Sequence, residues 1–184
     1  MDQEIADEAL MLRYRDGDAE SFEVLYARHR GPLYRYLLRQ CGESMAEELF
    51  QDIWLRLIRS RERYTVQAKF TTYLYQIAHH RVIDHYRKHS RAALTSFDDP
   101  KGPGELPAEH GDPLEESNRG RLLDQLLACL ERLPPAQREV FLLREEAGLS
   151  LDDIAAATGT NRETAKSRLR YAVAKLKREL RTLA

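Results

Sequence analysis

Residues 148–170 read GLSLDDIAAATGTNRETAKSRLR, a pattern that fits two short helices joined by a tight turn. Ser150 stands three residues before Asp153, which is the spacing at which two side chains cap the start of a helix. Thr158-Gly159-Thr160 makes the turn, because glycine and small polar residues interrupt helices. The stretch therefore predicts a helix-turn-helix.

The second helix of this motif is expected to run from Asn161 to about Leu180, with Thr160 and Glu163 repeating the cap. Its inward positions are small or apolar, namely Ala165, Leu169, Ala172, Val173 and Leu176. Its N-terminal turns are polar and are the part of a recognition helix that enters the major groove. The residues expected to contact double-stranded DNA there are Asn161, Arg162, Glu163, Thr164, Lys166, Ser167, Arg168 and Arg170.

The polarity of this helix has two explanations. Arg162 and Lys166 lie four residues apart on one face, so both can reach bases or phosphates within a single groove. A helical hairpin with a basic, solvated face would show the same polarity. Small inward residues, a glycine turn and a polar N-terminal start occur together here, and this combination favours the reading of DNA.

Helical periodicity extends outward from this motif over most of the chain. Apolar residues recur at steps of three and four in the segments 49–58, 70–82, 122–133 and 137–146. A further helix begins near Phe22 and is expected to break at Gly31-Pro32 before it resumes through Leu38. No alternating strand pattern competes, so the sequence predicts an all-α fold.

The segment between Ala92 and Asn118 separates these helices into two groups. It holds four of the 7 prolines of the chain, and that spacing leaves no room for a compact element. We interpret residues 93–118 as a flexible acidic linker between two small helical domains, residues 1–92 and residues 119–184.

The formal net charge of the chain is -1, but charge is distributed unevenly along it. Residues 1–24 sum to -6 and residues 92–118 to -6, whereas residues 61–91 sum to +5 and the stretch from Gly159 onward to +6. Two basic blocks separated by an acidic one suggest two anion-binding surfaces. Ordinary charged helix surfaces are the alternative for either block alone.

Composition and motifs exclude several classes of protein. The chain is 42% hydrophobic and 32% charged and lacks an apolar run of the roughly 20 residues needed to span a bilayer. Its first residues lack the pattern of a signal peptide, so we expect a cytoplasmic protein with no membrane insertion. Cys41 and Cys129 lie in apolar helical patterns and are expected to be buried free thiols.

Enzyme and metal chemistry are not expected. The sequence has no glycine-rich phosphate loop, no nucleophile elbow and no paired carboxylates in an apolar pocket, so we predict no catalytic residues and no cofactor. The helix that follows residue 70 is rich in candidate metal ligands, which are His79, His80, Asp84, His85 and His89. The pairs that share a face point in different directions, so we predict no metal site.

The polar loop from Ser60 to Lys69 combines basic and aromatic side chains. Such a mixture suits single-stranded nucleic acid, because rings stack on unpaired bases while cations follow the phosphates. Tyr64 is the expected stacking residue, whereas Phe70 and Tyr73 are expected to be buried anchors of the following helix.

Motifs in both halves of the chain resemble those of extracytoplasmic-function sigma factors of bacterial RNA polymerase. Residues 46–52 (AEELFQD) resemble the core-polymerase-binding region 2.2, and residues 70–80 (FTTYLYQIAHH) with Asp84 and Arg87 are similar to the promoter-melting helix. Residues 133–144 (LPPAQREVFLLR), Gly148-Leu149-Ser150, Ile154-Ala155 and residues 164–169 (TAKSRL) resemble region 4. The motifs follow the family's order and cover nearly all of the chain except the linker.

The resemblance implies a transcription initiation factor that binds core RNA polymerase and promoter DNA, both duplex and melted. The face expected to dock on the β′ clamp helices comprises Glu47, Glu48, Gln51, Asp52 and Leu55. A second implied contact on the polymerase is the β flap. The implied minus-10 contacts, which would hold the melted strand with a flipped base in the loop, are Arg61, Arg63, Tyr64, Lys69, Thr72, His79, His80, Asp84, Arg87 and Lys88. The polar turns that begin at Asn161 would read the minus-35 element.

Two residues depart from the family's pattern, and two other functional classes compete with it. The chain has Tyr73 where the family commonly has Trp, and His80 where it has Asn, so minus-10 specificity is not carried over. The first competing class is a free-standing helix-turn-helix regulator, which would not need the basic and aromatic segment 61–87. The second is an interaction module such as an anti-sigma protein, which would not need the face at 161–170. The resemblance also implies a partner that controls the chain, such as an anti-sigma factor.

Overall fold

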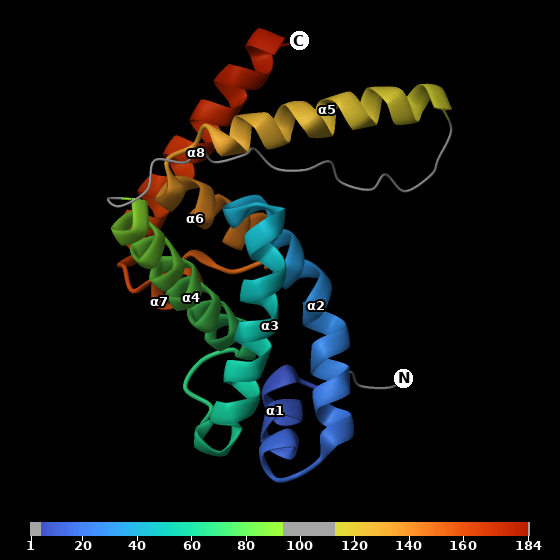
Figure 1. Cartoon of the computed structure of the whole chain (residues 1–184), viewed down its shortest axis with the longest axis vertical. Coiled ribbons are helices and arrows are strands. Elements are labelled where there is room, and N and C mark those ends of the chain that lie inside the picture. The colour runs from blue at the N-terminus through green and yellow to red at the C-terminus, as the bar shows by residue number, and fades with distance from the viewer. Residues whose placement is uncertain (1–4, 94–112, 184) are drawn as a thin grey trace.

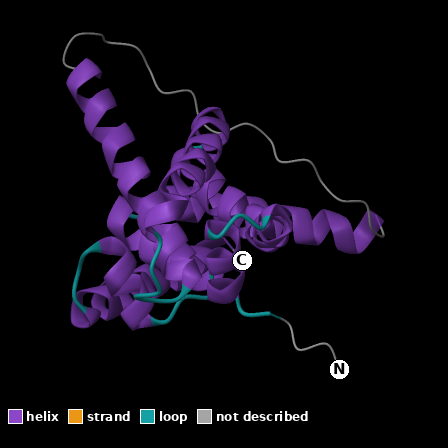
Figure 2. Cartoon of the chain, turned by 90° about the horizontal axis from the view of Figure 1, so that it is seen from below, coloured by secondary structure: helices purple, strands orange, loops and turns teal. Residues whose placement is uncertain are grey.

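The computed structural model describes residues 5–93 and 113–183, and the described residues form helices without strands (Figures 1 and 2). The all-α prediction is confirmed. Residues 94–112, the central part of the expected linker, lie outside the described residues. The elements in chain order are α1 (Asp7–Arg15), α2 (Ala19–Cys41), α3 (Glu43–Ser60), the single-turn η1 (Arg61–Arg63), α4 (Phe70–Ala93), α5 (Pro113–Glu131), α6 (Pro135–Glu145), α7 (Leu151–Thr158) and α8 (Arg162–Leu183).

Helices α1 to α4 enclose an aromatic core in the N-terminal domain. Phe22 and Phe50 each lie edge-on to Trp54, at ring-centroid distances of 5.8 and 6.3 Å, a geometry that aromatic pairs favour. Tyr36 of α2 crosses Tyr75 of α4 in the same way at 5.3 Å. These rings hold α2, α3 and α4 side by side, which places the loop between α3 and α4 at one end of the domain (Figure 1).

Helix α2 is continuous from Ala19 to Cys41, so the predicted break at Gly31-Pro32 is wrong. Proline lacks the backbone N–H that would bond to the preceding turn, and this costs helix stability. The residues that follow Pro32 offset that cost by burial, since Leu33, Tyr36 and Leu37 are each fully enclosed in the core. Tertiary packing therefore overrides the local preference at this position.

The helix-turn-helix forms as predicted. The Ser150 side chain accepts a hydrogen bond from the Asp153 amide at 3.1 Å, and Asp153 accepts one from the Ser150 amide at 3.3 Å, which confirms the capping box. Gly159 ends α7 with a φ of 62°, a left-handed conformation that only glycine adopts without strain. The turn residues are thus chosen by backbone geometry.

The cap of α8 differs from the prediction. The Asn161 side chain, not that of Thr160, accepts the hydrogen bond from the Thr164 amide, at 2.8 Å. Thr160 belongs to the turn, where its amide donates to the Ala155 carbonyl at 3.0 Å. Asn161 immediately precedes the first helical residue, and this is the position from which a side chain reaches the free amides of the first turn.

Helix α5 also starts earlier than expected, at Pro113, whereas the second domain was expected to start at residue 119. A proline is tolerated in the first turn of a helix because its missing N–H would have had no helical partner there. The expected linker therefore ends six residues early. The start of α5 and the end of α4 project from the body on different sides (Figure 2).

The two domains pack against each other, with α6 on α2 and α7 on α4 (Figure 1). At the centre of this interface Glu139 of α6 is only 5% exposed. One of its carboxylate oxygens accepts a hydrogen bond from the Tyr36 hydroxyl at 3.0 Å and lies 2.6 Å from His79 Nδ1. Burial, and next the adjacent charge of Glu139, raise the pKa of Tyr36, which therefore stays protonated as a donor.

Further polar contacts surround this centre. Glu146, at the end of α6, is held by the guanidinium groups of Arg35, whose Nε lies 2.8 Å away, and of Arg39. Arg138 donates to the Gln40 carbonyl at 3.3 Å. Acids of the C-terminal domain therefore meet bases and hydroxyls of the N-terminal domain.

Cys41 and Cys129 are free thiols, half-buried and buried respectively. Burial raises the pKa of the Cys41 thiol to about 12. Because the thiolate is the reactive form, Cys41 is unreactive at neutral pH in this structure.

Two leucines of α3 test how much the packing of the core contributes to the stability of the fold. Leu57 is fully buried, whereas Leu55 is 47% exposed on the opposite face. Leu57→Ala should lower the free energy of unfolding by about 2–5 kcal/mol, because it leaves a cavity in the core. Leu55→Ala should change it by less than about 0.5 kcal/mol. Urea unfolding followed by circular dichroism measures both, and equal losses would contradict the packing described.

Candidate nucleic-acid interface

The first turns of α8 form an exposed polar surface, which we call the reading face. Its exposed members are Asn161, Arg162, Glu163, Lys166 and Arg170, and its half-buried members are Thr164, Ser167 and Arg168. The structure thus brings all eight predicted residues together on consecutive turns of one helix. Apolar side chains on the opposite side of α8 pack against α6 and α7, which leaves the reading face open to solvent.

The charges on the reading face are only loosely paired. Arg162 Nε lies 3.2 Å from an oxygen of Asp152, and Lys166 Nζ lies 3.9 Å from one of Glu163. All four side chains are more than half exposed. Ion pairs in that environment contribute little to stability, so a DNA phosphate or base edge can displace them at low cost.

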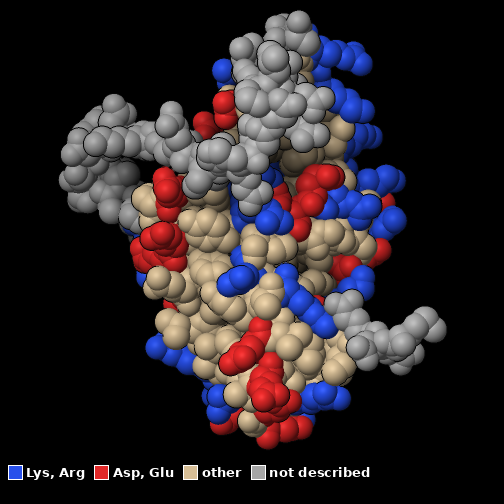
Figure 3. Space-filling view, turned by 90° about the vertical axis from the view of Figure 1, so that its right-hand side faces the viewer, with Lys and Arg blue, Asp and Glu red and all other residues tan. Residues whose placement is uncertain are grey.

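Basic residues are concentrated along α8 beyond the reading face as well. Figure 3 shows Lys and Arg side chains along the right-hand edge of the upper part of the molecule, which α8 forms, and a mixture of acidic and basic side chains at the lower end. The concentration along α8 matches the excess of bases in the stretch from Gly159 onward. A field of this kind orients a polyanion toward α8.

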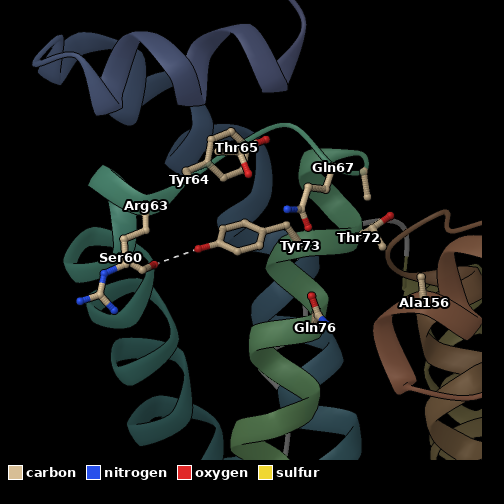
Figure 4. Close-up of a pocket in the computed structure, with 10 residues that line it drawn as sticks. Ser60, Arg63, Tyr64, Thr65, Gln67, Thr72, Tyr73, Gln76 and Ala156 are labelled. Atoms are coloured by element: carbon tan, nitrogen blue, oxygen red, sulfur yellow. Dashed lines mark hydrogen bonds between the residues drawn. The ribbon is translucent and has the colours of Figure 1, made fainter.

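A second candidate surface is a cavity of about 370 Å³ beside the loop between η1 and α4 (Figure 4). Polar side chains provide most of its wall: the lining residues are Ser60, Arg63, Tyr64, Thr65, Gln67, Ala68, Thr72, Tyr73, Gln76 and Ala156. Only the last of these comes from α7, so the cavity belongs to the N-terminal domain and α7 borders one edge of it. We call it the loop cavity.

The aromatic side chains at the loop cavity differ from the prediction. Tyr64, the predicted stacking residue, is only 3% exposed and packs on Tyr73 with ring centroids 5.2 Å apart, so its ring is not open for stacking in this structure. Burial, and next the charge of Glu8, raise the pKa of Tyr64 to about 12. Phe70 is fully buried as predicted, whereas Tyr73 is half-buried and shares a hydrogen bond with the Ser60 hydroxyl at 2.8 Å.

Of the ten lining residues, only Arg63, Tyr64 and Thr72 are among the predicted contacts, and the polar side chains of Gln76 and Thr65 are among those not predicted. Gln76 follows Thr72 by four residues on α4, and residues at that spacing lie on the same face of a helix. Because Thr72 was already predicted as a contact, the sequence could have indicated Gln76 as well. Thr65 carried no comparable signal. The amide of Gln76 is exposed and offers both a donor and an acceptor to a ligand.

The predicted minus-10 residues do not form a single cluster. Helix α4 rises about 24 Å from Thr72 to Lys88, so the set extends along the helix and only its beginning borders the loop cavity. Arg63, Lys69, His80, Arg87 and Lys88 are exposed, while Thr72 is buried and His79 and Asp84 are half-buried. Arg61 lies outside the cavity, with its guanidinium 5.4 Å from the centre of the Tyr14 ring.

Three of these residues contact acids of the C-terminal domain, although Lys69 stays 66% exposed. Asp153 of α7 accepts hydrogen bonds from Lys69 Nζ at 2.9 Å and from the Thr72 hydroxyl at 3.1 Å. His79 lies against Glu139, as described above. Burial alone would raise the pKa of Asp153, but hydrogen bonds from Ser150, Lys69 and Thr72 outweigh it and lower the pKa to about 2. Asp153 is therefore ionised at neutral pH.

The predicted polymerase-binding residues lie on the outer side of α3. Glu47, Glu48, Gln51 and Leu55 are exposed, and they are neighbours at helical spacing. Asp52 is half-buried and forms an ion pair with Arg81 of α4. An exposed leucine among acids and an amide gives this face both an apolar and a charged component.

The described residues contain no group of three His, Cys, Asp or Glu side chains placed to hold a metal ion. In the described ranges, no helix combines the length and the apolar character needed to cross a bilayer.

A helical domain with a polar cavity beside a basic loop, joined to a helix-turn-helix, defines a two-domain DNA-binding protein. The Sigma-70 region 2 family matches residues 25–92, and the Sigma-70, region 4 family matches residues 123–176. RNA polymerase sigma factor CarQ of Myxococcus xanthus is 33% identical over 169 residues, which cover 91% of this chain and 93% of CarQ.

Two further relatives carry the name of the subgroup. ECF RNA polymerase sigma factor BldN of Streptomyces coelicolor is 31% identical over 178 residues, 95% of this chain and 63% of BldN. ECF RNA polymerase sigma factor SigE of Mycolicibacterium smegmatis is 30% identical over 150 residues, 81% of this chain and 57% of SigE. The chain belongs to the extracytoplasmic-function (ECF) sigma factors. It is a promoter-directing transcription initiation factor, and this family membership favours that function over a free-standing regulator.

Solved structures of two sigma factors share the fold. RpoE of Bartonella quintana, crystallised with the anti-sigma factor NepR, has a TM-score of 0.77 at 22% identity, covering 89% of this chain and 98% of RpoE. CnrH, in complex with the cytosolic domain of CnrY, has a TM-score of 0.69 at 22% identity, covering 98% of this chain and 100% of CnrH.

Two lysines on α8 test the reading face. Lys166 lies on it, and Lys177 is equally basic and exposed but three turns further along. Lys166→Ala or Arg162→Ala should weaken discrimination of the cognate upstream element by about 1–3 kcal/mol if the contact reaches a base. Lys177→Ala should not change it. Competition binding of the polymerase complex to matched and scrambled upstream elements measures the difference, and an equal loss on all sequences would indicate phosphate anchoring instead.

Proposed function

We propose that this sigma factor divides promoter recognition between its two domains, with α8 reading duplex DNA and the loop cavity holding melted DNA. The observation that carries the proposal is the presence of two unlike surfaces in one chain. The reading face is convex, basic and exposed, as suits a major groove. The loop cavity is concave and polar, as suits a single base taken out of its stack.

The reading face is assigned to the minus-35 element. Arg162 and Lys166 project from successive turns at the start of α8, where a recognition helix meets base edges. The surrounding small polar groups, Thr164 and Ser167, are half-buried at the edge of this surface. Short side chains of that kind bond to phosphates and fix the register of a helix in the groove.

The loop cavity is assigned to the minus-10 element. Its volume of about 370 Å³ is at the small end of ligand sites, which suits one base and not a longer stretch of strand. Gln67 and Gln76 offer amide donors and acceptors for a base edge, and Arg63 offers a cation for the backbone. His80, Arg87 and Lys88 lie exposed further along α4, where they would follow the same strand.

The outer side of α3 is assigned to core polymerase. Leu55, the exposed apolar residue of this face, would occupy the dry centre of an interface while Glu48 and Gln51 form its polar rim. This is the docking on the β′ clamp helices that the sequence resemblance implies, and the β flap would contact the C-terminal domain.

Regulation and location are part of the proposal. RpoE was solved with the anti-sigma factor NepR, and CnrH with the cytosolic domain of CnrY. By likeness of fold, we expect an anti-sigma factor or another signal-controlled partner to bind this chain. It would act in the cytoplasm, where polymerase and promoter DNA meet, and have no catalytic activity or cofactor of its own.

Run-off transcription tests the proposed function directly. Core RNA polymerase with the purified chain should produce transcripts from a defined set of genomic fragments, whereas core enzyme or the chain alone should not. The transcript starts, once aligned, should share an upstream and a minus-10 element. Strong operator binding by the chain alone, with no transcript when core enzyme is added, would contradict the proposal.

The assignment of α3 gives a second, sharper test. Leu55→Ala should weaken binding to core polymerase by about tenfold, since an exposed leucine at an interface centre contributes about 1–2 kcal/mol. Val24→Ala is the matched control, because Val24 is an exposed apolar residue of α2, at 40% against 47% for Leu55. Fluorescence titration of labelled core enzyme measures both, and equal affinities of the two variants would refute the assignment of α3.

A further inference from the structure

The loop between η1 and α4 forms one side of the loop cavity and has few backbone bonds of its own. Within the described ranges, residues 65–68 take part in no backbone–backbone hydrogen bond. A segment whose backbone groups do not pair with one another takes its shape from the contacts that hold its two ends. The groups that hold these ends therefore determine the shape of this side of the cavity.

The start of α4 has no capping side chain at the usual position. Lys69 directly precedes Phe70, the first residue of α4, and its carbonyl accepts a helical hydrogen bond from the Tyr73 amide at 3.1 Å. A side-chain oxygen at this position normally accepts a hydrogen bond from an amide of the first turn. A lysine side chain has no acceptor, and its positive charge is unfavourable at the positive end of the helix dipole.

Helix α1 supplies the missing acceptor. The Phe70 amide donates a hydrogen bond to a carboxylate oxygen of Glu8 at 2.6 Å, across 62 positions of the sequence. Glu8 is half-buried, and an acid at this end of a helix also interacts favourably with the helix dipole. The start of α4 is therefore held by a side chain from another helix.

Helix α1 also holds the other end of the loop. Arg15 Nη1 donates a hydrogen bond to the Tyr64 carbonyl at 3.4 Å, and the Arg61 guanidinium lies over the Tyr14 ring. Figure 1 shows α1 at the same end of the domain as this loop. In the part of the chain that the structure describes, no α1 side chain lines the loop cavity. An effect of α1 on a bound base must therefore pass through the loop and α4.

We propose that Glu8 is a positioning residue for melted DNA: by capping α4 at Phe70 it fixes the first turns of α4, which form part of the loop-cavity wall. Thr72 and Gln76 stand on those turns and line the cavity. The inference rests on the proposed assignment of the loop cavity to the minus-10 element. It goes further by giving the first helix a part in recognising a base that this helix does not touch.

Two substitutions of Glu8 separate the position of its carboxylate from its charge. Glu8→Asp keeps the charge but shortens the side chain by one methylene, so the carboxylate no longer reaches the Phe70 amide. Glu8→Gln removes the charge but keeps the length and an acceptor oxygen. Glu23→Asp is the matched control, because Glu23 is an exposed acid of α2 in the same domain.

The variants are compared as complexes of the full chain with core polymerase, on a promoter identified by run-off transcription. The probe is a promoter fragment with a mismatched, unpaired minus-10 region, in which each non-template base is replaced in turn by an abasic sugar. The wild type should lose about tenfold in affinity at the position of the captured base, since hydrogen bonds to the base edge are lost. Glu8→Asp should reduce that factor to about twofold, while Glu8→Gln and Glu23→Asp keep it.

This factor distinguishes positioning from a general structural role. Lower stability alone would weaken binding to the intact and the abasic fragments equally, and an unchanged factor in Glu8→Asp would overturn the proposal. A reduced factor in Glu8→Gln with an unchanged one in Glu8→Asp would overturn it as well, because charge alone would then be responsible.

Hydrogen exchange of the full chain, followed by mass spectrometry, checks the cap itself. The start of α4 should exchange faster in Glu8→Asp than in the wild type, and Glu23→Asp should match the wild type. Equal exchange in all three proteins would overturn the proposal. Promoter-specific transcripts from the wild-type enzyme would then show that the proposed function holds without it. A wild type indifferent to every abasic replacement would refute the assignment of the loop cavity, and this inference with it.

Discussion

The packing of the two domains in this chain is centred on one buried carboxylate, that of Glu139. A charge removed from water is costly unless hydrogen bonds compensate it. Glu139 has two partners, Tyr36 and His79, and both come from the other domain. Their hydrogen bonds compensate the free-energy cost of burying the carboxylate only when α6 lies on α2 and α4 in one register. That register then sets the position of α7, which follows α6 closely and carries Asp153 to Lys69. This electrostatic requirement, together with the interdomain contacts of Glu146 and Asp153, fixes the arrangement of the two domains.

This arrangement affects the two proposed DNA surfaces differently. The reading face of α8 points away from the interdomain contact, and its bases form only exposed, weak ion pairs. The loop cavity lies at the contact itself and is partly walled by α7. The two proposed DNA surfaces therefore differ in how closely they depend on the packing of the two domains.

Much of the fold follows from local sequence signals, and the exceptions share a physical cause. Apolar periodicity, the capping box at Ser150 and the glycine turn at Gly159 act within a few residues, so they are readable in the sequence. The continuity of α2 through Pro32 and the burial of Tyr64 depend on packing against other helices, which overrides local preference. Glu139 contacts His79, which is 60 positions away in the sequence, and Tyr36, which is 103 positions away. No pattern in a single sequence marks such distant pairs. Asp153 was found as a capping residue, but its second role at Lys69 depends on the same long-range contact.

Zero-length cross-linking tests the central claim, that the C-terminal domain packs on the N-terminal domain with Asp153 against Lys69, more directly than any affinity. A carbodiimide joins an amine to a carboxylate only when the two groups touch, as Lys69 and Asp153 do at 2.9 Å. Mass spectrometry of the free chain should find a peptide pair joined through Lys69 and Asp153. Absence of the pair from the free chain would contradict the account.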